Sequence, residues 1–247
     1  MNIELIQNIR QYVVENIGAF HQARLDNLNR LKLKKVIAHK NPYLFRAKNA
    51  DTAEFIVKSI VDAFLSSGEE TIFGDWLEGL AIYICQQVYG GCKSSAKGVD
   101  LEFDKEGCHY LVSIKSGPNW GNSSQIKKLI EEFKSAKKTL RTSRHNMNIV
   151  AVNGCCYGKD KSPDKGDYFK YCGQEFWSFI SGETDLYTEL IEPLATQAKE
   201  RNEEFSVQYA NKINLFVKEF IDEFCAKDGS IDWKKIVIFN SGGQNNA

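Results

Sequence analysis

The sequence predicts an α/β fold in which a central mixed β-sheet is flanked by helices, with further helical segments at both ends of the chain. Three observations lead to this prediction. Apolar residues recur at helical spacing before residue 90 and again after residue 185. Residues 98–104 alternate apolar and acidic side chains, which is the period of a half-buried strand. From residue 108 to residue 158, a strand, a basic helix and a second strand follow one another.

Three helices are expected before the sheet. The apolar spacing predicts helices over residues 2–28 and 51–66, which Asn41-Pro42 separates. A third helix should run from about residue 74 to residue 89, and Glu78 lies at the margin of its apolar stripe. The first part of the chain is therefore expected to be helical.

The sheet is expected to begin with a hairpin. Residues 98–104 and 108–115 would pair antiparallel through the turn Lys105-Glu106-Gly107. A basic amphipathic helix should then run from about residue 123 to residue 140, followed by a buried strand in MNIVAVNGCCYG, residues 147–158. Because a strand, a helix and a strand at this spacing form a crossover unit, the last two strands should be parallel.

After the sheet the chain is expected to be helical again. YCGQEFWSFISGE, residues 171–183, predicts a buried aromatic helix, and residues 186–224 predict two amphipathic helices. We expect the whole chain to form a single domain. Its helical amino-terminal part, its core and its helical carboxy-terminal part would be residues 1–70, 71–180 and 181–247 of the 1–247 chain.

The charge is balanced overall but unevenly distributed. The chain has 43% hydrophobic residues and a formal net charge of zero, which argues against an indiscriminate polyanion binder. Two stretches are nevertheless basic, residues 21–48 and residues 127–144. Each could simply be the solvated face of a helix, but two such runs beside one central region favour a phosphate-binding surface.

Cysteine content and hydropathy indicate the cellular compartment in which the protein is expected. The seven cysteines are an odd number without the paired spacing of a zinc ribbon, so we expect reduced thiols and no complete disulfide framework. No apolar run approaches the roughly 20 residues of a membrane span. The amino terminus MNIELIQNIR lacks the apolar core of a signal peptide. We therefore expect a cytoplasmic protein that does not enter the membrane.

A candidate site for phosphodiester hydrolysis lies on the predicted hairpin. Asp100 and Glu102 share one face of the first strand, and Lys115 lies on the second strand near its exit from the sheet. Carboxylates beside a lysine can hold a hard divalent cation while the ammonium orients an attacking water. The alternative is a solvated acidic edge with a simple ion pair. The polar segment 116–125 favours the site, because ordering it costs entropy unless something docks there.

Four segments of the sequence carry a family resemblance. They are FGDWLEGLA, VSIKSGPNWGNSSQ, NGCCYGK and CGQEFWSFISG, and they cover about residues 70–185. Asp100 precedes a hairpin turn, and Lys115 ends the next strand, before a helix and another strand. This arrangement resembles the PD-(D/E)xK nuclease superfamily, and the whole chain resembles a type II restriction endonuclease. The resemblance implies a restriction-endonuclease-like core.

The resemblance implies that Asp100 is a metal-binding carboxylate and that Lys115 is the catalytic lysine. The superfamily places a second acid two residues before the lysine, where this chain has Ser113. A hydroxyl is a poor magnesium ligand beside a carboxylate, so another acid should complete the site. Glu78 from the preceding helix is the first choice and Glu102 the second. If neither reaches the metal, the chain would bind DNA without cutting it.

The segment after the lysine is expected to contact DNA. Amide and hydroxyl side chains can read base edges, and lysines can contact phosphates. The predicted DNA-binding residues are Asn119, Trp120, Asn122, Ser123, Ser124, Gln125, Lys127 and Lys128. Two alternatives stay open, since Ser123 could be only the cap of the following helix and Trp120 could be a core residue.

Together, the residues and the resemblance predict a homodimeric, Mg²⁺-dependent endonuclease that cuts double-stranded DNA at a short palindromic site. Asp100, Glu78 and the main-chain carbonyl of Ile114 would hold Mg²⁺, and Lys115 would position the attacking water. A palindrome suits a two-fold dimer, whose interface the terminal helices could form. The alternatives are a catalytically lapsed DNA-binding module and a structure-directed repair or resolving nuclease.

Overall fold

The computed structural model describes residues 2–143 and 148–242. Arg144, from the second basic stretch, and Met147, from the start of the predicted last strand, lie outside the described residues. The contacts within the chain divide it into two compact units. Unit 1 comprises Met1–Gly18 and Phe73–Thr196, and unit 2 comprises Ala19–Ile72 and Gln197–Ala247. Helices α1 (Ile3–Arg30) and α4 (Ala53–Tyr89) contribute residues to both units.

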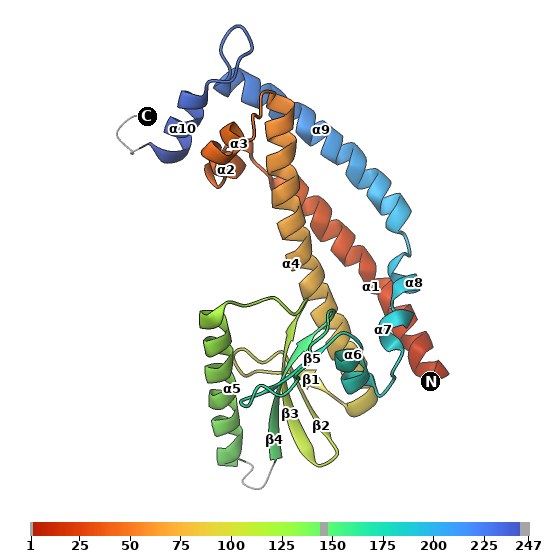
Figure 1. Cartoon of the computed structure of the whole chain (residues 1–247). Coiled ribbons are helices and arrows are strands. Elements are labelled where there is room, and N and C mark those ends of the chain that lie inside the picture. Colours follow the sequence, from red (N-terminus) through yellow and green to blue (C-terminus); the bar gives the residue numbers. More distant parts are fainter. Residues whose placement is uncertain (1, 144–147, 243–247) are drawn as a thin grey trace. The chain divides into compact units, whose positions relative to one another are not determined.

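Unit 1 contains a five-stranded mixed sheet with the order β1-β2-β3-β4-β5 (Figure 1). The pairs β1–β2 and β2–β3 are antiparallel, and the pairs β3–β4 and β4–β5 are parallel. The strands are β1 (Cys92–Lys93), β2 (Leu101–Lys105), β3 (Cys108–Lys115), β4 (Asn148–Cys155) and β5 (Phe169–Cys172). The predicted hairpin and the predicted parallel crossover are thus both confirmed.

Helices cover both faces of this sheet. Because side chains alternate across a strand, Leu111 and Val112 of β3 belong to different hydrophobic clusters. Leu111 joins Leu129 and Phe133 of α5 (Ser123–Ser143), which lies along one face in Figure 1. Val112 joins a larger cluster with residues from α1, from α4 and from α6 (Gln174–Ser181). The predicted fold class, a mixed sheet flanked by helices, is confirmed.

Unit 2 is helical. It contains parts of α1 and α4 with α2 (Leu33–Ala38), α3 (Pro42–Ala47), α9 (Ala198–Phe224) and α10 (Trp233–Ser241). Their apolar faces meet in a separate cluster that includes the fully buried side chains of Val57, Val61 and Phe220. The Asn41 side chain caps α3, and Pro42 occupies its first turn. The expectation that residues 1–247 act as a single domain stays a prediction.

The predicted break between residues 66 and 74 is wrong. A single 37-residue helix, α4, replaces the two helices that were expected over residues 51–66 and 74–89. The connecting segment contains no proline, so the helical hydrogen bonds can continue through it. Gly68 lies where α4 meets α1, and a Cβ at this position would collide with the Asn27 side chain. This glycine therefore permits a close helix contact and does not end the helix.

The carboxy-terminal prediction also needs correction. Two helices were expected over residues 186–224, but the structure has two single turns, α7 (Leu186–Glu189) and α8 (Ile191–Leu194), before α9 begins at Ala198. The buried aromatic helix expected over residues 171–183 is present as α6. The sequence did not indicate β1, β5 or α10, which are all short. In the described part of the chain, no helix combines the length and hydropathy needed to cross a bilayer.

Candidate active site

The hairpin of unit 1 brings Asp100 and Lys115 together. The main-chain N–H of Asp100 donates to the carbonyl of Val112 at 2.8 Å, which extends the pairing of β2 and β3 by one residue. Lys115 is the last residue of β3. Its Nζ lies 3.7 Å from Oδ2 of Asp100, and both side chains are partly exposed. The two groups predicted to act together therefore lie at one end of the sheet.

Hydrogen bonds from β3 hold the Asp100 carboxylate. Its Oδ2 accepts from the main-chain N–H of Ile114 at 2.6 Å and from the Ser113 hydroxyl at 3.3 Å. The Lys115 ammonium donates to the Ile114 carbonyl at 2.9 Å. Ser113 is buried, and its hydroxyl has the Asp100 carboxylate as its hydrogen-bond partner. It supplies no negative charge at the position where the superfamily has an acid.

Glu78 of α4 lies close enough to this pair for both charges to act on its carboxyl group. Burial raises the pKa of its carboxyl group, and the negative charge of Asp100 raises it further, while Lys93 and Lys115 act in the opposite direction. The carboxylate lies 3.6 Å from the Lys93 ammonium. Two carboxylates that repel each other in a partly buried place are the arrangement that a bound cation would stabilise.

Glu102 is engaged elsewhere. Its carboxylate accepts a hydrogen bond from the Ser94 hydroxyl and lies 3.3 Å from Nε2 of His109. The other ring nitrogen of His109 lies 2.7 Å from Asp104, and the imidazole is buried. The acidic side chains on and just before β2 therefore have different partners. Asp100 lies beside Lys115, whereas Glu102 and Asp104 flank His109.

The oxygen donors near Lys115 fit a hard divalent cation. They are the carboxylates of Asp100 and Glu78 and the main-chain carbonyl of Ile114, and such cations prefer oxygen ligands and retain several waters. Within residues 2–143 and 148–242, no three His, Cys, Asp or Glu side chains are grouped so that they could hold a metal ion. A metal at this site would therefore depend on two carboxylates, main-chain oxygen and water.

The predicted DNA-binding residues lie in the loop after β3 and in the first turns of α5. Asn119, Ser123, Ser124, Lys127 and Lys128 are exposed. Their positions leave them accessible to a ligand at this end of the sheet.

Two further predicted DNA-binding residues form the cap of α5. Oδ1 of Asn122 accepts from the main-chain N–H groups of Ser124 and Gln125, both at 3.1 Å. The Gln125 side chain returns a hydrogen bond by accepting from the Asn122 N–H at 2.9 Å. The alternative that Ser123 is the cap is wrong, because Asn122 fills that role. Binding of DNA by Asn122 and Gln125 stays a prediction.

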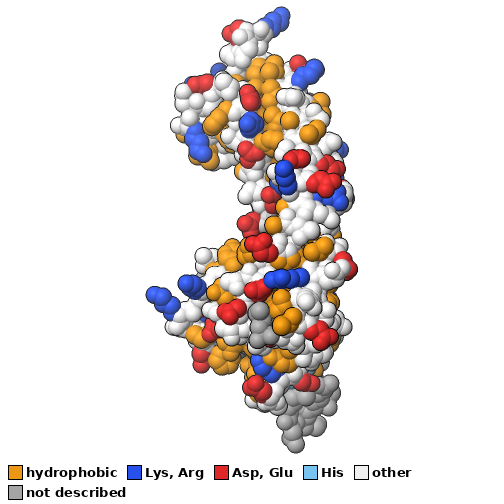
Figure 2. Space-filling view, turned by 90° about the vertical axis from the view of Figure 1, so that its right-hand side faces the viewer, with side chains coloured by type: hydrophobic (Ala, Val, Ile, Leu, Met, Phe, Trp, Pro, Cys, Tyr) orange, Lys and Arg blue, Asp and Glu red, His pale blue; other side chains and the backbone are white. Residues whose placement is uncertain are grey.

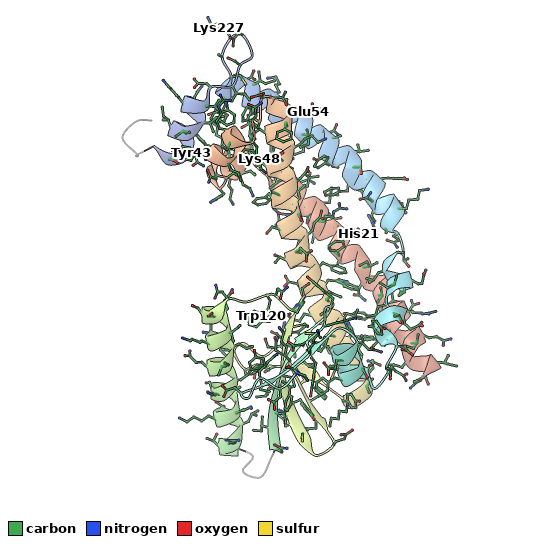
Figure 3. All side chains as sticks on the ribbon, viewed as in Figure 1. His21, Tyr43, Lys48, Glu54, Trp120 and Lys227 are labelled. Carbon is green, nitrogen blue, oxygen red and sulfur yellow. The ribbon has the colours of Figure 1, made fainter. Side chains whose placement is uncertain are left out.

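Trp120 has partners within the protein. Its Nε1–H donates to Oδ1 of Asn153 at 2.9 Å, and the Lys115 ammonium lies 5.5 Å from the centre of the indole ring. Figure 3 shows Trp120 beside the amino-terminal end of α5. Asn153 is fully buried and also donates to the Ser113 carbonyl at 3.1 Å. Sequence reasoning missed Asn153, although an amide inside the apolar run NIVAVNGCC was a visible signal.

Sequence reasoning also missed Lys170 of β5. Its ammonium donates to the carbonyl of Pro118 at 2.8 Å and lies 3.7 Å from Asp160. Gly117 of the same loop lies against the Tyr157 ring, with which a Cβ at this position would collide. The loop that follows Lys115 is therefore held by two neighbouring segments. No sequence motif pointed to Lys170.

Comparison with known proteins shows the family to which the chain belongs. The family model described as Type II restriction endonuclease EcoO109I matches residues 7–202, which is most of the chain and includes all the predicted site residues. A search of the curated proteins found no match. The match covers most of unit 1, the Ala19–Ile72 part of unit 2 and the first residues of α9. Because this family model matches more than half of the chain, the chain belongs to the EcoO109I family of type II restriction endonucleases.

Proposed function

We propose that this restriction endonuclease is Mg²⁺-dependent and hydrolyses phosphodiester bonds within a short palindromic site in double-stranded DNA. The observation that carries the proposal is the 3.7 Å pairing of Asp100 with Lys115, with Glu78 close to both. A carboxylate pair beside a lysine provides the groups that metal-assisted hydrolysis requires.

Each group has a proposed role. Asp100, Glu78 and the carbonyl of Ile114 would hold Mg²⁺, which when bound supplies positive charge for the reacting phosphate. Lys115 orients the water that attacks the phosphorus in line with the leaving oxygen. The N–H of Ile114 and the hydroxyl of Ser113 hold Asp100 in place. Glu102 is the second candidate for the acid, and its contacts with Ser94 and His109 make it the weaker one.

The proposed DNA surface is the loop after β3 and the start of α5. Asn119, Ser123 and Ser124 would read base edges, and Lys127 and Lys128 would contact phosphates. Lys128 lies 4.0 Å from Glu132, so its charge is partly offset in the absence of DNA. The chain has a formal net charge of zero, and basic and acidic side chains are interspersed over the side drawn in Figure 2, which is the side away from α5. Specific local contacts should therefore matter more than a general attraction to phosphate.

A palindromic site favours a homodimer, because each half-site then meets the same surface of one protomer. The helical segments at both ends of the chain are the proposed interface. The dimer and a cytoplasmic location stay predictions.

Plasmid cleavage tests this proposal. The purified chain is incubated with several plasmids of known sequence in Mg²⁺ or EDTA, with Lys115→Ala in parallel. Discrete fragments that require Mg²⁺ and that the Lys115→Ala protein does not produce would support the proposal. Retention of DNA without cleavage would indicate a lapsed binding module, in line with the serine at position 113. Cleavage of branched DNA alone would indicate a repair or resolving nuclease.

A further inference from the structure

Trp120 connects the loop expected to read DNA with the proposed catalytic lysine. The indole lies between two groups, with its N–H bound to Asn153 at 2.9 Å and its ring 5.5 Å from the Lys115 ammonium. The side chain is only partly exposed and packs against the hydrophobic cluster under α5. These contacts fix both the position and the plane of the ring.

Asn153 is suited to hold the indole in one orientation. It pairs with Ser113 in the register of β3 and β4, and its amide donates to the Ser113 carbonyl at 3.1 Å. This bond leaves the amide oxygen directed to the Trp120 N–H. Because the side chain is fully buried, loss of the Ser113 bond would leave the amide nitrogen unsatisfied, and loss of the Trp120 bond would leave the amide oxygen with only the Cys155 thiol, a weak donor at 3.8 Å. The indole is therefore held from the strand adjacent to the one that ends at Lys115.

We propose that Trp120 is a positioning residue for Lys115, held in place by Asn153, and that its main contribution is to the rate of cleavage and not to DNA binding. The proposal rests on the assignment of Lys115 under the proposed function. A lysine side chain has four rotatable bonds and a mobile ammonium. The Ile114 carbonyl, Asp100 and the ring face of Trp120 together confine that ammonium to one place.

The location of Trp120 has a consequence for specificity. Trp120 directly follows Asn119 and lies close before the cap residue Asn122, so it belongs to the segment that would touch DNA. A shift of this segment on correct binding would reach the Lys115 ammonium through the indole ring. Recognition and catalysis would then be linked by a direct contact.

Two substitutions separate positioning from DNA contact. Trp120→Leu removes the aromatic face and the N–H donor, whereas Trp120→Phe keeps a smaller aromatic face and loses the donor. Single-turnover cleavage is measured on a plasmid fragment that the wild-type protein cuts, and binding of the same fragment is measured with Ca²⁺ in place of Mg²⁺. We expect Trp120→Leu to cleave about 10- to 100-fold more slowly with binding changed less than about threefold. Trp120→Phe should recover part of the rate.

The control variants are chosen for contrast. Trp233→Phe changes a tryptophan in unit 2 and should leave the rate within about twofold. Asn119→Ala changes the exposed neighbour and should weaken DNA binding. Weakened binding with an unchanged single-turnover rate in Trp120→Leu would overturn the proposal and identify Trp120 as a DNA contact. An unchanged rate together with unchanged binding would overturn it as well.

A measurement without DNA keeps the inference separate from the proposed function. The indole N–H resonance of Trp120, identified by its loss in Trp120→Phe, is followed by NMR in Lys115→Ala and Asn153→Ala. Both variants should shift this resonance, and Asn153→Ala should shift it more because it removes the acceptor. A resonance that neither variant moves would contradict the contacts themselves. If the wild-type protein cuts no DNA, the proposed function fails while this measurement still decides the contact.

Discussion

The carboxylate of Asp100 accepts a hydrogen bond of 2.6 Å from the main-chain N–H of Ile114. This bond joins the residue just before β2 to the penultimate residue of β3, so the orientation of the carboxylate depends on the register of the hairpin. A backbone donor cannot be removed by a side-chain change. The relationship therefore allows the charge of Asp100 to be altered while its position is kept.

Asp100→Asn should abolish most of the cleavage and leave the fold intact. The amide oxygen can still accept from Ile114, whereas the negative charge needed to hold a cation is lost. We expect the cleavage rate to fall by a factor on the order of 100 or more, since metal-assisted stabilisation contributes several kcal/mol. Plasmid cleavage over a range of Mg²⁺ concentrations measures it, with the urea midpoint as the folding control. Cleavage at the wild-type rate would remove Asp100 from the site.

The choice between Glu78 and Glu102 can be made with a matched pair of amides. Glu78→Gln should lower the cleavage rate on the order of 100-fold and raise the Mg²⁺ concentration needed for half-maximal cleavage. The reason is that it removes the second carboxylate near Asp100. Glu102→Gln keeps an oxygen that can accept from Ser94 and should change the rate less than about threefold. The reverse order of effects would assign the metal to Glu102.

Lys170→Met should weaken DNA binding by loosening the loop after β3. The substitution keeps an unbranched side chain that is one atom shorter and removes the 2.8 Å bond to the Pro118 carbonyl. Loss of a charged hydrogen bond of about 1.5 kcal/mol corresponds to about tenfold in affinity. Lys165→Met is the control, because it removes the 2.9 Å partner of Asp160 without touching the loop. Equal effects of the two changes would show that the ion pairs matter and the loop bond does not.

Asp160 should contribute stability that acid removes. The hydrogen bond from Lys165 and the N–H of Ser162 lower the pKa of this carboxyl group below its usual value near 4. A lowered pKa in the folded state means that the contribution is present above the unfolded pKa and is lost as pH falls through the folded pKa. Compared with Asp160→Asn, the wild-type protein should be more stable by about 0.5 kcal/mol at pH 7. Urea unfolding of both proteins at pH 7 and below pH 4 measures this difference in stability. The difference should be present at pH 7 and should disappear at the acidic pH.

Gly154→Ala should destabilise unit 1 because the strand and α6 are in close contact there. A Cβ on Gly154 of β4 would collide with the Phe176 ring, which is fully buried. Overpacking of this kind costs about 1–3 kcal/mol. Gly18→Ala is the opposite case, since a Cβ there meets nothing within 4 Å inside α1 and should raise stability slightly. Thermal or urea unfolding of both variants distinguishes crowding from a general effect of losing glycine.

The helices and strands were predicted correctly where the evidence in the sequence was local. The alternation of residues 98–104, the turn at Gly107 and the apolar stripe of α5 each depend on neighbours a few positions away. The same local evidence failed between residues 66 and 74, where two helices were expected and one continuous helix is present. Contact with Asn27, far away in the sequence, explains why Gly68 lies there in the middle of a helix.

The sequence by itself determined the mixed sheet, the hairpin that brings Asp100 beside Lys115, and the family resemblance. Its patterns record how each residue relates to its chain neighbours, and a hairpin makes such neighbours meet across two strands. Only the tertiary structure decided that Glu78 lies near Asp100, that Glu102 is engaged with His109, and that Asn153 holds Trp120 against the lysine side of the site. These pairs join separate elements, and their contacts depend on how helices and strands pack, which periodicity along one segment does not encode.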